Sequence, residues 1–298
     1  ENLIFYYYYY SIEIFSFNFI VFFVIITAMI KKMIALDLDG TLLRSDNTIS
    51  DYTVETIKKV QNKGHKVVIA TGRPYRMALE HYRRLELSTP MISFNGSLTH
   101  LPEKKWEWEH SVTIDKQYLL DILDMQQSIE ADFIASEYRK KFYISAQDHN
   151  RVNPQLFGVP EITKKMSMDI KKITKNPNGI LMQTRHQDKY ALAEEMRKHF
   201  NYAIEVDSWG GPLNILEFSP KGINKAYALK YLLKILNISQ DNLIAFGDEH
   251  NDTEMLSFAG TGYAMKNASD TLLPFADKQS EFSNEEDGVA KELEKIFL

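Results

Sequence analysis

Short apolar runs alternate with amphipathic stretches along most of this chain, and this alternation constrains its fold more than any other feature. Apolar runs of strand length occupy residues 33–38, 65–70, 91–94, 243–246 and 262–265. Helices are predicted over 51–63, 74–85, 223–236, 251–259 and 287–297. Strands that alternate with helices form βαβ units, which assemble into a parallel sheet covered on both faces. The sequence therefore predicts an α/β protein with a Rossmann-like core.

Residues 114–213 follow a different pattern. Their apolar segments are short and mixed with polar residues, and two helical stretches, 118–130 and 189–200, lie among them. This is typical of an α+β unit. We expect residues 33–113 and 214–298 to form one discontinuous core domain and residues 114–213 to form a domain inserted into it.

The first 32 residues are unlike the rest of the chain. They contain eleven aromatic side chains, and residues 14–30 carry no charge. Seventeen uncharged residues are at the lower limit for a membrane-spanning helix, and the lysines that follow would place the next domain in the cytoplasm. The alternative is a non-native or dispensable leader, with translation starting at Met33 or Met29. The segment contains no plausible catalytic group on either interpretation.

Composition excludes several classes of protein. Hydrophobic residues make up 44% and charged residues 25% of the chain, as in a globular protein with a buried core. The net charge of -5 argues against a broad basic surface for nucleic acid. The chain has no cysteine, which excludes disulfides, thiolate metal sites and cysteine nucleophiles. A reducing compartment such as the cytoplasm suits such a chain.

The sharpest local motif is the pair of carboxylates Asp37 and Asp39, which lie at the end of the first predicted strand and precede Gly40. Ligands of open parallel sheets bind beyond the carboxyl ends of the strands. Carboxylates there can hold Mg²⁺ or attack phosphorus as nucleophiles. A generic turn and a glycosyltransferase-like metal pair remain as alternatives. An EF-hand loop does not fit, because it requires glycine at its sixth position.

Two further motifs could bind phosphate. Thr71 and Gly72 follow the second predicted strand, where a hydroxyl, a backbone amide and the next helix N-terminus could meet phosphate oxygens. A plain glycine turn explains the same residues. Lys225 lies on the first turn of the helix over 223–236 and could neutralise a phosphate, although Lys221 is a nearby competitor for this role.

Acidic residues also follow a strand near the C-terminus. Asp248 follows the strand over 243–246 and Gly247, and Asp252 lies at the start of the next helix. Acidic residues are common at helix N-termini, so this position alone does not establish a site. His250 lies between them and receives no assigned role.

Together, these motifs resemble the haloacid dehalogenase (HAD) superfamily of phosphohydrolases, and within it the Cof-type branch, or subfamily IIB. The resemblance extends from Met33 to Leu298. In chain order the matching segments are DLDGTLL (37–43), ATGR (70–73), SFNG (93–96), SPKGINKA (219–226), GDEHNDTEML (247–256), AMKNA (264–268) and DGVA (287–290). The first and fifth of these segments are highly specific in combination. One departure is Asn-Lys-Ala at 224–226, where the family more often has Ser-Lys-Gly.

The resemblance implies catalytic roles for three residues. Asp37 would be the nucleophile that forms an aspartyl-phosphate. Asp39 would be the general acid toward the leaving group and then the base for water. Lys225 would stabilise the charge on Asp37 and the phosphoryl group.

The resemblance also implies binding roles. Mg²⁺ would be held by Asp37, the Asp39 carbonyl, Asp248 and Asp252. The phosphoryl group would be held by Leu38, Thr71, Gly72 and Asn251. Further positions at the cleft would be Arg73, Asn95 and Asn267. The inserted domain would be a C2-type cap that closes over the cleft and selects the substrate.

The resulting expectation is a Mg²⁺-dependent phosphatase of small phosphorylated metabolites, either sugar phosphates or cofactor and nucleotide phosphates. Two alternatives remain: a phosphomutase or phosphotransferase of the same fold, and a non-catalytic, membrane-tethered HAD-fold binding protein. The motifs specify neither the particular metabolite nor the oligomeric state. Residues 209–212, near the expected return to the core, could form a hinge or a plain linker.

Overall fold

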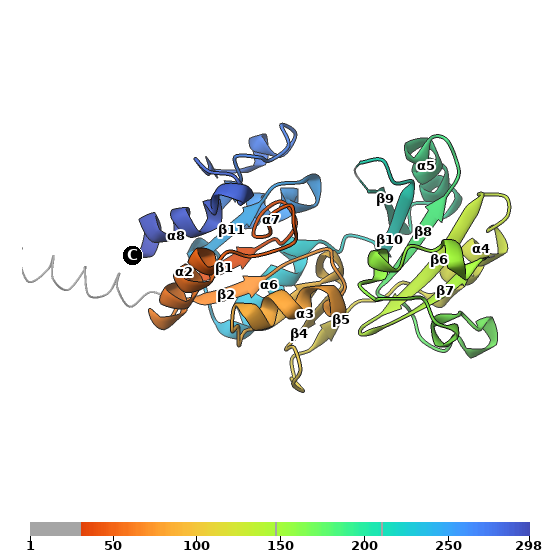
Figure 1. Cartoon of the computed structure of the whole chain (residues 1–298), viewed down its shortest axis with the longest axis horizontal. Helices are drawn as coiled ribbons and strands as arrows, with labels where there is room; N and C mark the ends of the chain where they lie inside the picture. The colour runs from red at the N-terminus through yellow and green to blue at the C-terminus, as the bar shows by residue number, and fades with distance from the viewer. Residues whose placement is uncertain (1–30, 147, 210) are drawn as a thin grey trace, which may run out of the picture.

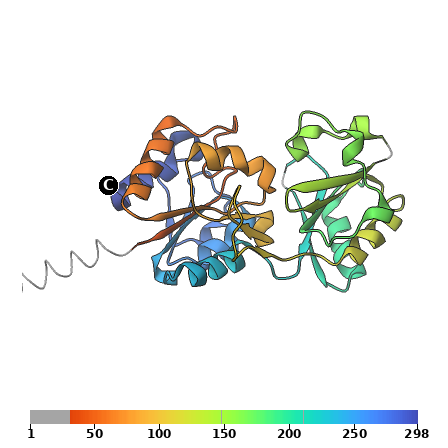
Figure 2. The same ribbon diagram turned by 90° about the horizontal axis from the view of Figure 1, so that it is seen from below.

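The computed structural model describes residues 31–146, 148–209 and 211–298. Two bodies are visible in Figures 1 and 2: the first and last thirds of the described chain combine in one, and the middle third forms the other. We call them the core and the cap. The expected leader lies outside the described residues except for Lys31 and Lys32. Within the described ranges, no helix is long and apolar enough to cross a membrane.

A parallel sheet of five strands forms the centre of the core, in the order β13-β12-β11-β1-β2. The α/β class predicted from the sequence is therefore confirmed. Parallel register places Leu36 of β1 between Phe246 of β11 and Ile69 of β2. The carboxyl ends of these strands consequently meet at one edge. The strands are β1 (Met33–Leu36), β2 (Lys66–Ile69), β11 (Leu243–Gly247), β12 (Thr261–Ala264) and β13 (Lys278–Gln279).

The sheet continues on its β2 side through a small antiparallel sheet. A parallel bridge joins Ala70 to Ile92 in β3 (Met91–Ser93). β3 pairs with β4 (Leu98–His100), which pairs with β5 (His110–Ser111). The sequence analysis did not predict β4, β5 or β13, because strands of two or three residues are too short to show an alternating pattern.

Helices cover both faces of the core sheet (Figure 1). The apolar residues of the two sheet faces belong to separate clusters, one packed with α2, α3 and α8 and the other with α6 and α7. Ser50 caps α2 as predicted, since its side chain accepts a hydrogen bond from the Thr53 amide. The helices are α2 (Asp51–Asn62), α3 (Tyr75–Arg84), α6 (Lys225–Leu236), α7 (Thr253–Phe258) and α8 (Gly288–Phe297).

The cap is built on an antiparallel sheet in the order β7-β6-β8-β10-β9, and two helices pack against one of its faces. The predicted helix over 118–130 ends earlier, because the chain turns through Glu130 at a φ of 51° before it enters β6. The elements are α4 (Lys116–Asp124), β6 (Ala131–Tyr138), β7 (Lys141–Ala146), β8 (Gly179–Thr184), α5 (Lys189–His199), β9 (Ile204–Ser208) and β10 (Ile215–Pro220).

The cap sheet extends past residue 213, where the sequence analysis placed the end of the insertion. β10 pairs antiparallel with both β8 and β9, so the chain returns to the core only after Pro220. Trp209 and residues 211–213 therefore lie between β9 and β10 and not in a connection between the bodies. The buried Lys189 ammonium holds this loop by donating hydrogen bonds of 2.7–2.9 Å to three of its carbonyls, those of Trp209, Gly211 and Leu213.

Side chains join the cap to the core. Arg76 of α3 donates two hydrogen bonds of 2.7 Å to the carboxylate of Glu137 in β6, and a third of 2.6 Å to the carbonyl of Phe157. The Asn178 amide of the cap donates to the Ser97 and Val112 carbonyls at 3.1 and 2.9 Å. These contacts fix the side of the cap sheet that faces the core.

Candidate active site

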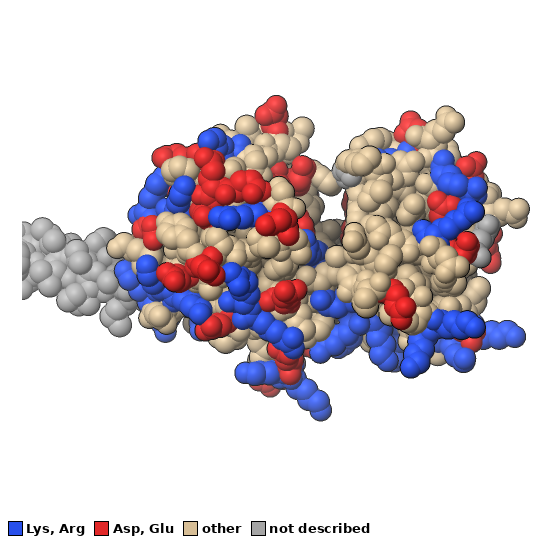
Figure 3. Space-filling model, in the orientation of Figure 1, with Lys and Arg blue, Asp and Glu red and all other residues tan. Residues whose placement is uncertain are grey.

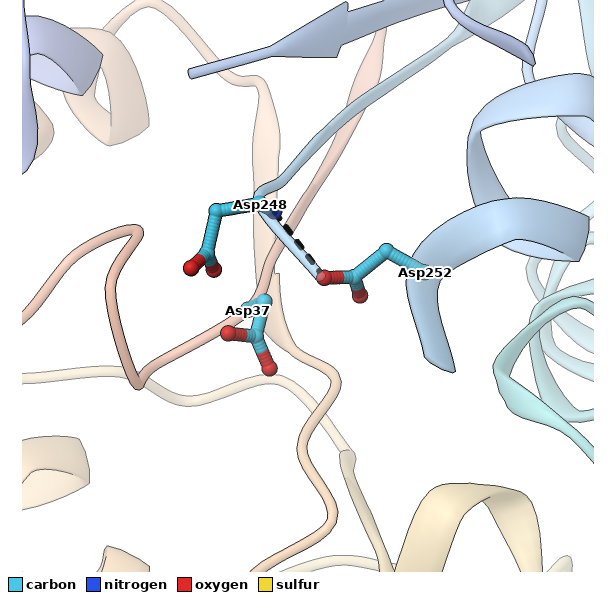
Figure 4. A group of neighbouring side chains, drawn as sticks. All are labelled: Asp37, Asp248 and Asp252. Atoms are coloured by element: carbon cyan, nitrogen blue, oxygen red, sulfur yellow. Dashed lines mark hydrogen bonds between the residues drawn. The ribbon is translucent and has the colours of Figure 1, made fainter. Parts of the chain in front are cut away.

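Three carboxylates gather where β1 and β11 end. Asp37 follows β1, and its amide donates to the Phe246 carbonyl of β11 at 3.1 Å. Asp248 follows β11, and Asp252 lies on the short 3₁₀ turn before α7. Each of the three offers a carboxylate oxygen, and these atoms lie within 4.8 Å of one another. Figure 4 shows the side chains approaching from separate segments, with a hydrogen bond between the Asp248 amide and Asp252.

Lys225, the first residue of α6, is the cation of this cluster. Its ammonium donates to Asp37 Oδ1 at 2.5 Å and to Asp252 Oδ1 at 2.7 Å, and its side chain is fully buried. Burial alone would lower the pKa of Lys225, but Asp252 and Asp37 raise it above its ordinary value. Lys221 is exposed and lies 3.8 Å from Glu205, so it is not the lysine of this cluster.

The cluster has a deficit of positive charge, because one ammonium faces three buried carboxylates. Burial raises the pKa of Asp37, against the opposing effect of Lys225. Burial also raises the pKa of Asp248 to about 7, although the Thr41 hydroxyl donates to its carboxylate at 2.8 Å. Buried oxygen ligands with unbalanced negative charge are what a hard divalent cation requires. These residues therefore fit Mg²⁺.

Asp39 is oriented away from the other carboxylates. Its two oxygens accept hydrogen bonds from the Arg73 guanidinium at 2.8 and 2.5 Å, and Arg73 also donates to Asn47 at 2.6 Å. The Asp39 side chain is 61% exposed. Its carboxylate thus faces the open cleft, which leaves its backbone carbonyl as the atom that could join a metal site.

The structure brings together three residues that were predicted to hold the phosphoryl group and one, Asn95, that was predicted to lie at the cleft. Thr71 is buried, and its hydroxyl accepts from the Arg73 amide at 3.1 Å. A Cβ added to Gly72 would lie 3.1 Å from Asn95 Oδ1, so a larger residue there would press on the Asn95 amide. Asn251 donates to the same Asn95 oxygen at 3.1 Å. These side chains form one connected group beside the carboxylates.

The turn after Asp39 packs tightly against Asp248. Gly40 has a φ of +71°, and a Cβ there would overlap the Asp248 carboxylate. Asn267 braces this turn by donating to the Gly40 carbonyl at 2.7 Å. The Leu38 carbonyl accepts from the amides of the same turn and its side chain is buried, so its backbone amide is the atom that could meet a phosphoryl oxygen.

Sequence reasoning missed two parts of this region. Thr41, which bonds Asp248, follows the first motif directly and could have been included from its position. Glu217 in β10 could not have been identified from the sequence, because nothing near it in the sequence distinguishes it from other acidic residues. The structure places its carboxylate within hydrogen-bonding distance of Asn95 and Trp209.

This chain is similar in sequence and in fold to known proteins. Residues 34–293 match the family model of haloacid dehalogenase-like hydrolases. A solved structure of a haloacid dehalogenase-like hydrolase from Bacteroides thetaiotaomicron is 28% identical and superposes with a TM-score of 0.75. It covers 90% of this chain, and this chain covers all of it.

Two curated relatives come from Bacillus subtilis (strain 168). One, the 5-amino-6-(5-phospho-D-ribitylamino)uracil phosphatase YitU, is 32% identical over 89% of this chain and 97% of its own length. The other, the phosphatase of the same substrate named YcsE, is 31% identical over 90% of this chain and 96% of its own length. The similarity thus spans the core and the cap.

Proposed function

Because this chain belongs to the haloacid dehalogenase-like hydrolases and is a phosphoric monoester hydrolase of that family, we propose that it is a Mg²⁺-dependent phosphatase that acts through an aspartyl-phosphate on Asp37. The observation that carries this proposal is the buried group of Asp37, Asp248, Asp252 and Lys225 at the carboxyl ends of β1 and β11. Phosphoryl transfer depends on positioning and on neutralisation of oxygen charge, and this group can supply both.

The metal would be held by Asp37, Asp248 and the Asp39 carbonyl, with Asp252 in support. Mg²⁺ bound there would add the positive charge that draws in the phosphoryl oxygens. Asp252 has a second task, because it accepts hydrogen bonds from Lys225 and from the Asp248 amide. It therefore fixes the lysine and the metal-binding loop relative to each other.

In the first step, Asp37 attacks phosphorus while the bond from phosphorus to the ester oxygen breaks. Lys225 holds Oδ1 of Asp37, which leaves Oδ2 as the attacking atom. The leaving oxygen needs a proton, which Asp39 donates from the open side of the site. Before this step, Asp39 has to part from Arg73, its hydrogen-bond partner in this structure, and take up a proton from solvent.

In the second step, water attacks phosphorus and the bond between phosphorus and Asp37 breaks. Asp39, now a carboxylate, accepts the proton of this water. Inorganic phosphate leaves and Asp37 is regenerated. The Thr71 hydroxyl and the amides of Leu38 and Gly72 would hold the phosphoryl oxygens during both steps.

The substrate class follows from the relatives. Two phosphatases that match nearly the whole chain act, by their names, on 5-amino-6-(5-phospho-D-ribitylamino)uracil. We therefore propose a small phosphorylated metabolite with a polyhydroxylated chain, and we take this compound as the first candidate. Sugar phosphates and cofactor phosphates such as flavin mononucleotide complete the set to be tested. The cytoplasm remains the predicted location.

The decisive experiment measures inorganic phosphate released from this set by protein that begins at Met33. Mg²⁺ should be required, and Asp37→Asn should abolish turnover while the circular dichroism spectrum stays unchanged. Asp124→Asn, an exposed carboxylate at the end of α4, is the matched control and should retain full activity. Retained turnover in Asp37→Asn would rule out the mechanism. Transfer of phosphate to a second hydroxyl, without free phosphate, would identify a phosphotransferase instead.

A further inference from the structure

One carboxylate of the cap reaches the group of residues beside the proposed phosphoryl site. Glu217 lies in β10 and is partly buried. Its Oε1 accepts from the Asn95 amide of the core at 3.5 Å, and its Oε2 accepts from the Trp209 indole at 3.1 Å. Glu217 is thus a cap side chain in contact with the core.

The face of the cap sheet explains this position. Leu216 and Phe218 point to the side that α4 and α5 cover, and they belong to the apolar cluster there. Glu217 lies between them and, because side chains alternate along a strand, points to the opposite side. Glu137 of β6, which binds Arg76 of the core, is on that same side. Glu217 therefore faces the core. Figure 3 shows a hollow between the core and the cap on the face that it draws.

A short series of contacts connects Glu217 to the proposed phosphoryl site. Asn95, its partner, also accepts from Asn251 at 3.1 Å and lies against Gly72. Both Asn251 and Gly72 belong to the proposed phosphate-binding group. Asn95 has a left-handed backbone with a φ of 50°, as does Phe94 at 53°. Glu217 is consequently separated from the proposed phosphate-binding group by one side chain, that of Asn95.

The chemistry of a carboxylate limits what it can bind at this place. An ionised carboxylate has no proton to donate and would repel a phosphate, so it is unsuited to the phosphoryl group itself. It can accept about four hydrogen bonds, and the described residues of the chain donate two. The contact with Asn95 is at the long limit for a hydrogen bond, so a better donor could replace it. Hydroxyl groups of an ester's alcohol part are such donors.

We propose that Glu217 is a specificity-determining residue that accepts hydrogen bonds from hydroxyl groups of the alcohol part of the substrate, and so selects phosphate esters of polyols. This proposal rests on the proposed phosphatase function. Burial raises the pKa of Glu217 to about 7, so the ionised carboxylate predominates only above this pH, and the test is carried out at pH 8.

The test compares two phosphate esters. Ribitol 5-phosphate offers hydroxyl donors, whereas phenyl phosphate offers none beyond the phosphoryl group. The wild-type enzyme should prefer ribitol 5-phosphate in kcat/KM. Glu217→Ala should reduce kcat/KM for ribitol 5-phosphate about tenfold to a hundredfold, mainly through KM, because a hydrogen bond to a charged group is lost. Its kcat/KM for phenyl phosphate should stay within about twofold of wild type.

Two further variants separate recognition from structure. Glu217→Gln keeps the shape of the side chain and an acceptor for Trp209, so it should fold normally and lose only part of the preference. Glu195→Ala removes an exposed carboxylate on α5, on the other side of the cap sheet, and should change neither ester. A parallel titration would measure binding of ribitol 5-phosphate to Asp37→Asn protein with and without Glu217→Ala, and should show a matching loss of affinity.

Several results would overturn the proposal. An equal loss for both esters would show that Glu217 only holds the cap against the core. If Glu217→Ala keeps the preference for ribitol 5-phosphate, or if the wild type has no such preference, Glu217 does not bind the hydroxyl groups of the substrate. Absence of turnover of every ester by the wild-type enzyme would instead refute the proposed function on which the inference rests.

Discussion

Replacement of Lys225 by methionine tests the electrostatic account of the site most directly. The ammonium is fully buried and makes hydrogen bonds of 2.5 and 2.7 Å to two carboxylates. Methionine fills similar space without charge, so the change leaves three buried carboxylates with no cation. Breaking a buried ion pair by removal of one partner costs about 3 to 5 kcal/mol. We expect the free energy of unfolding to fall by this amount at neutral pH, with EDTA present so that no divalent cation replaces the lysine.

The pH dependence provides a second, independent signature. Burial raises the folded-state pKa of Asp37 and Asp248, the latter to about 7, so the folded state binds protons more tightly than the unfolded state. Protonation therefore stabilises the fold as the pH falls from about 7 toward the ordinary values near 4. This effect should be larger in Lys225→Met, where the opposing cation is absent. The stability deficit of the variant should therefore shrink between pH 8 and pH 5.

The assay is urea denaturation of both proteins across this pH range, together with phosphate release. Lys221→Met is the matched control, because this lysine is exposed and only weakly paired, and a surface ion pair adds little stability. Activity of Lys225→Met should fall by about a hundredfold or more, in line with removal of a preorganised charge from a catalytic site. A variant as stable as wild type at pH 8, with no pH-dependent difference, would refute this reasoning.

Three further predictions address other parts of the molecule. Arg76→Met removes the partner of Glu137, whose side chain is only 8% exposed, and should lower the free energy of unfolding in urea by about 3 to 5 kcal/mol. The double variant with Glu137→Leu should largely restore this stability, and additive effects of the two substitutions would contradict a coupled pair. Burial lowers the pKa of His100 to about 4. The neutral His100 therefore contributes its full stability above about pH 6.5, and this contribution is lost as the pH falls toward 4. His100→Phe should reduce this loss of unfolding free energy at low pH by about 3 kcal/mol in urea denaturation. A loss that the substitution leaves unchanged would contradict the assignment. Mg²⁺ at a hundred times its dissociation constant should stabilise the protein by about 2.7 kcal/mol in thermal unfolding, and a shift of equal size in Asp248→Asn would place the metal elsewhere.

Much of the core could be predicted because its signals are local. The apolar runs that form β1, β2 and β11 are bounded by residues that stop strands, and α2 carries its own cap at Ser50. Parallel pairing follows from the intervening helices, so the strand ends that carry Asp37 and Asp248 had to share an edge. The end of the cap was harder to predict, because β10 joins β8 and β9 through pairing between strands distant in the sequence.

The choice between Lys221 and Lys225 shows what remained open in the sequence. The two residues are four positions apart and chemically identical. Helix α6 starts at Lys225 and packs against β1. This arrangement buries the Lys225 ammonium between Asp37 and Asp252, whereas the Lys221 ammonium stays in solvent. Burial then gives this lysine its energetic importance, because the same ion pair at the surface would contribute little.

The sequence by itself therefore determined the fold class and the order of the motifs, and it predicted which residues would carry the chemistry, since strand ends, caps and acidic pairs are properties of neighbouring residues. Only the tertiary structure decided that Asp39 pairs with Arg73, that Arg76 of the core binds Glu137 of the cap, and that Glu217 reaches Asn95. Each of these contacts joins residues that are 34 to 122 positions apart. Such pairs depend on how packed sheets and helices place side chains in space, and no local pattern encodes that placement.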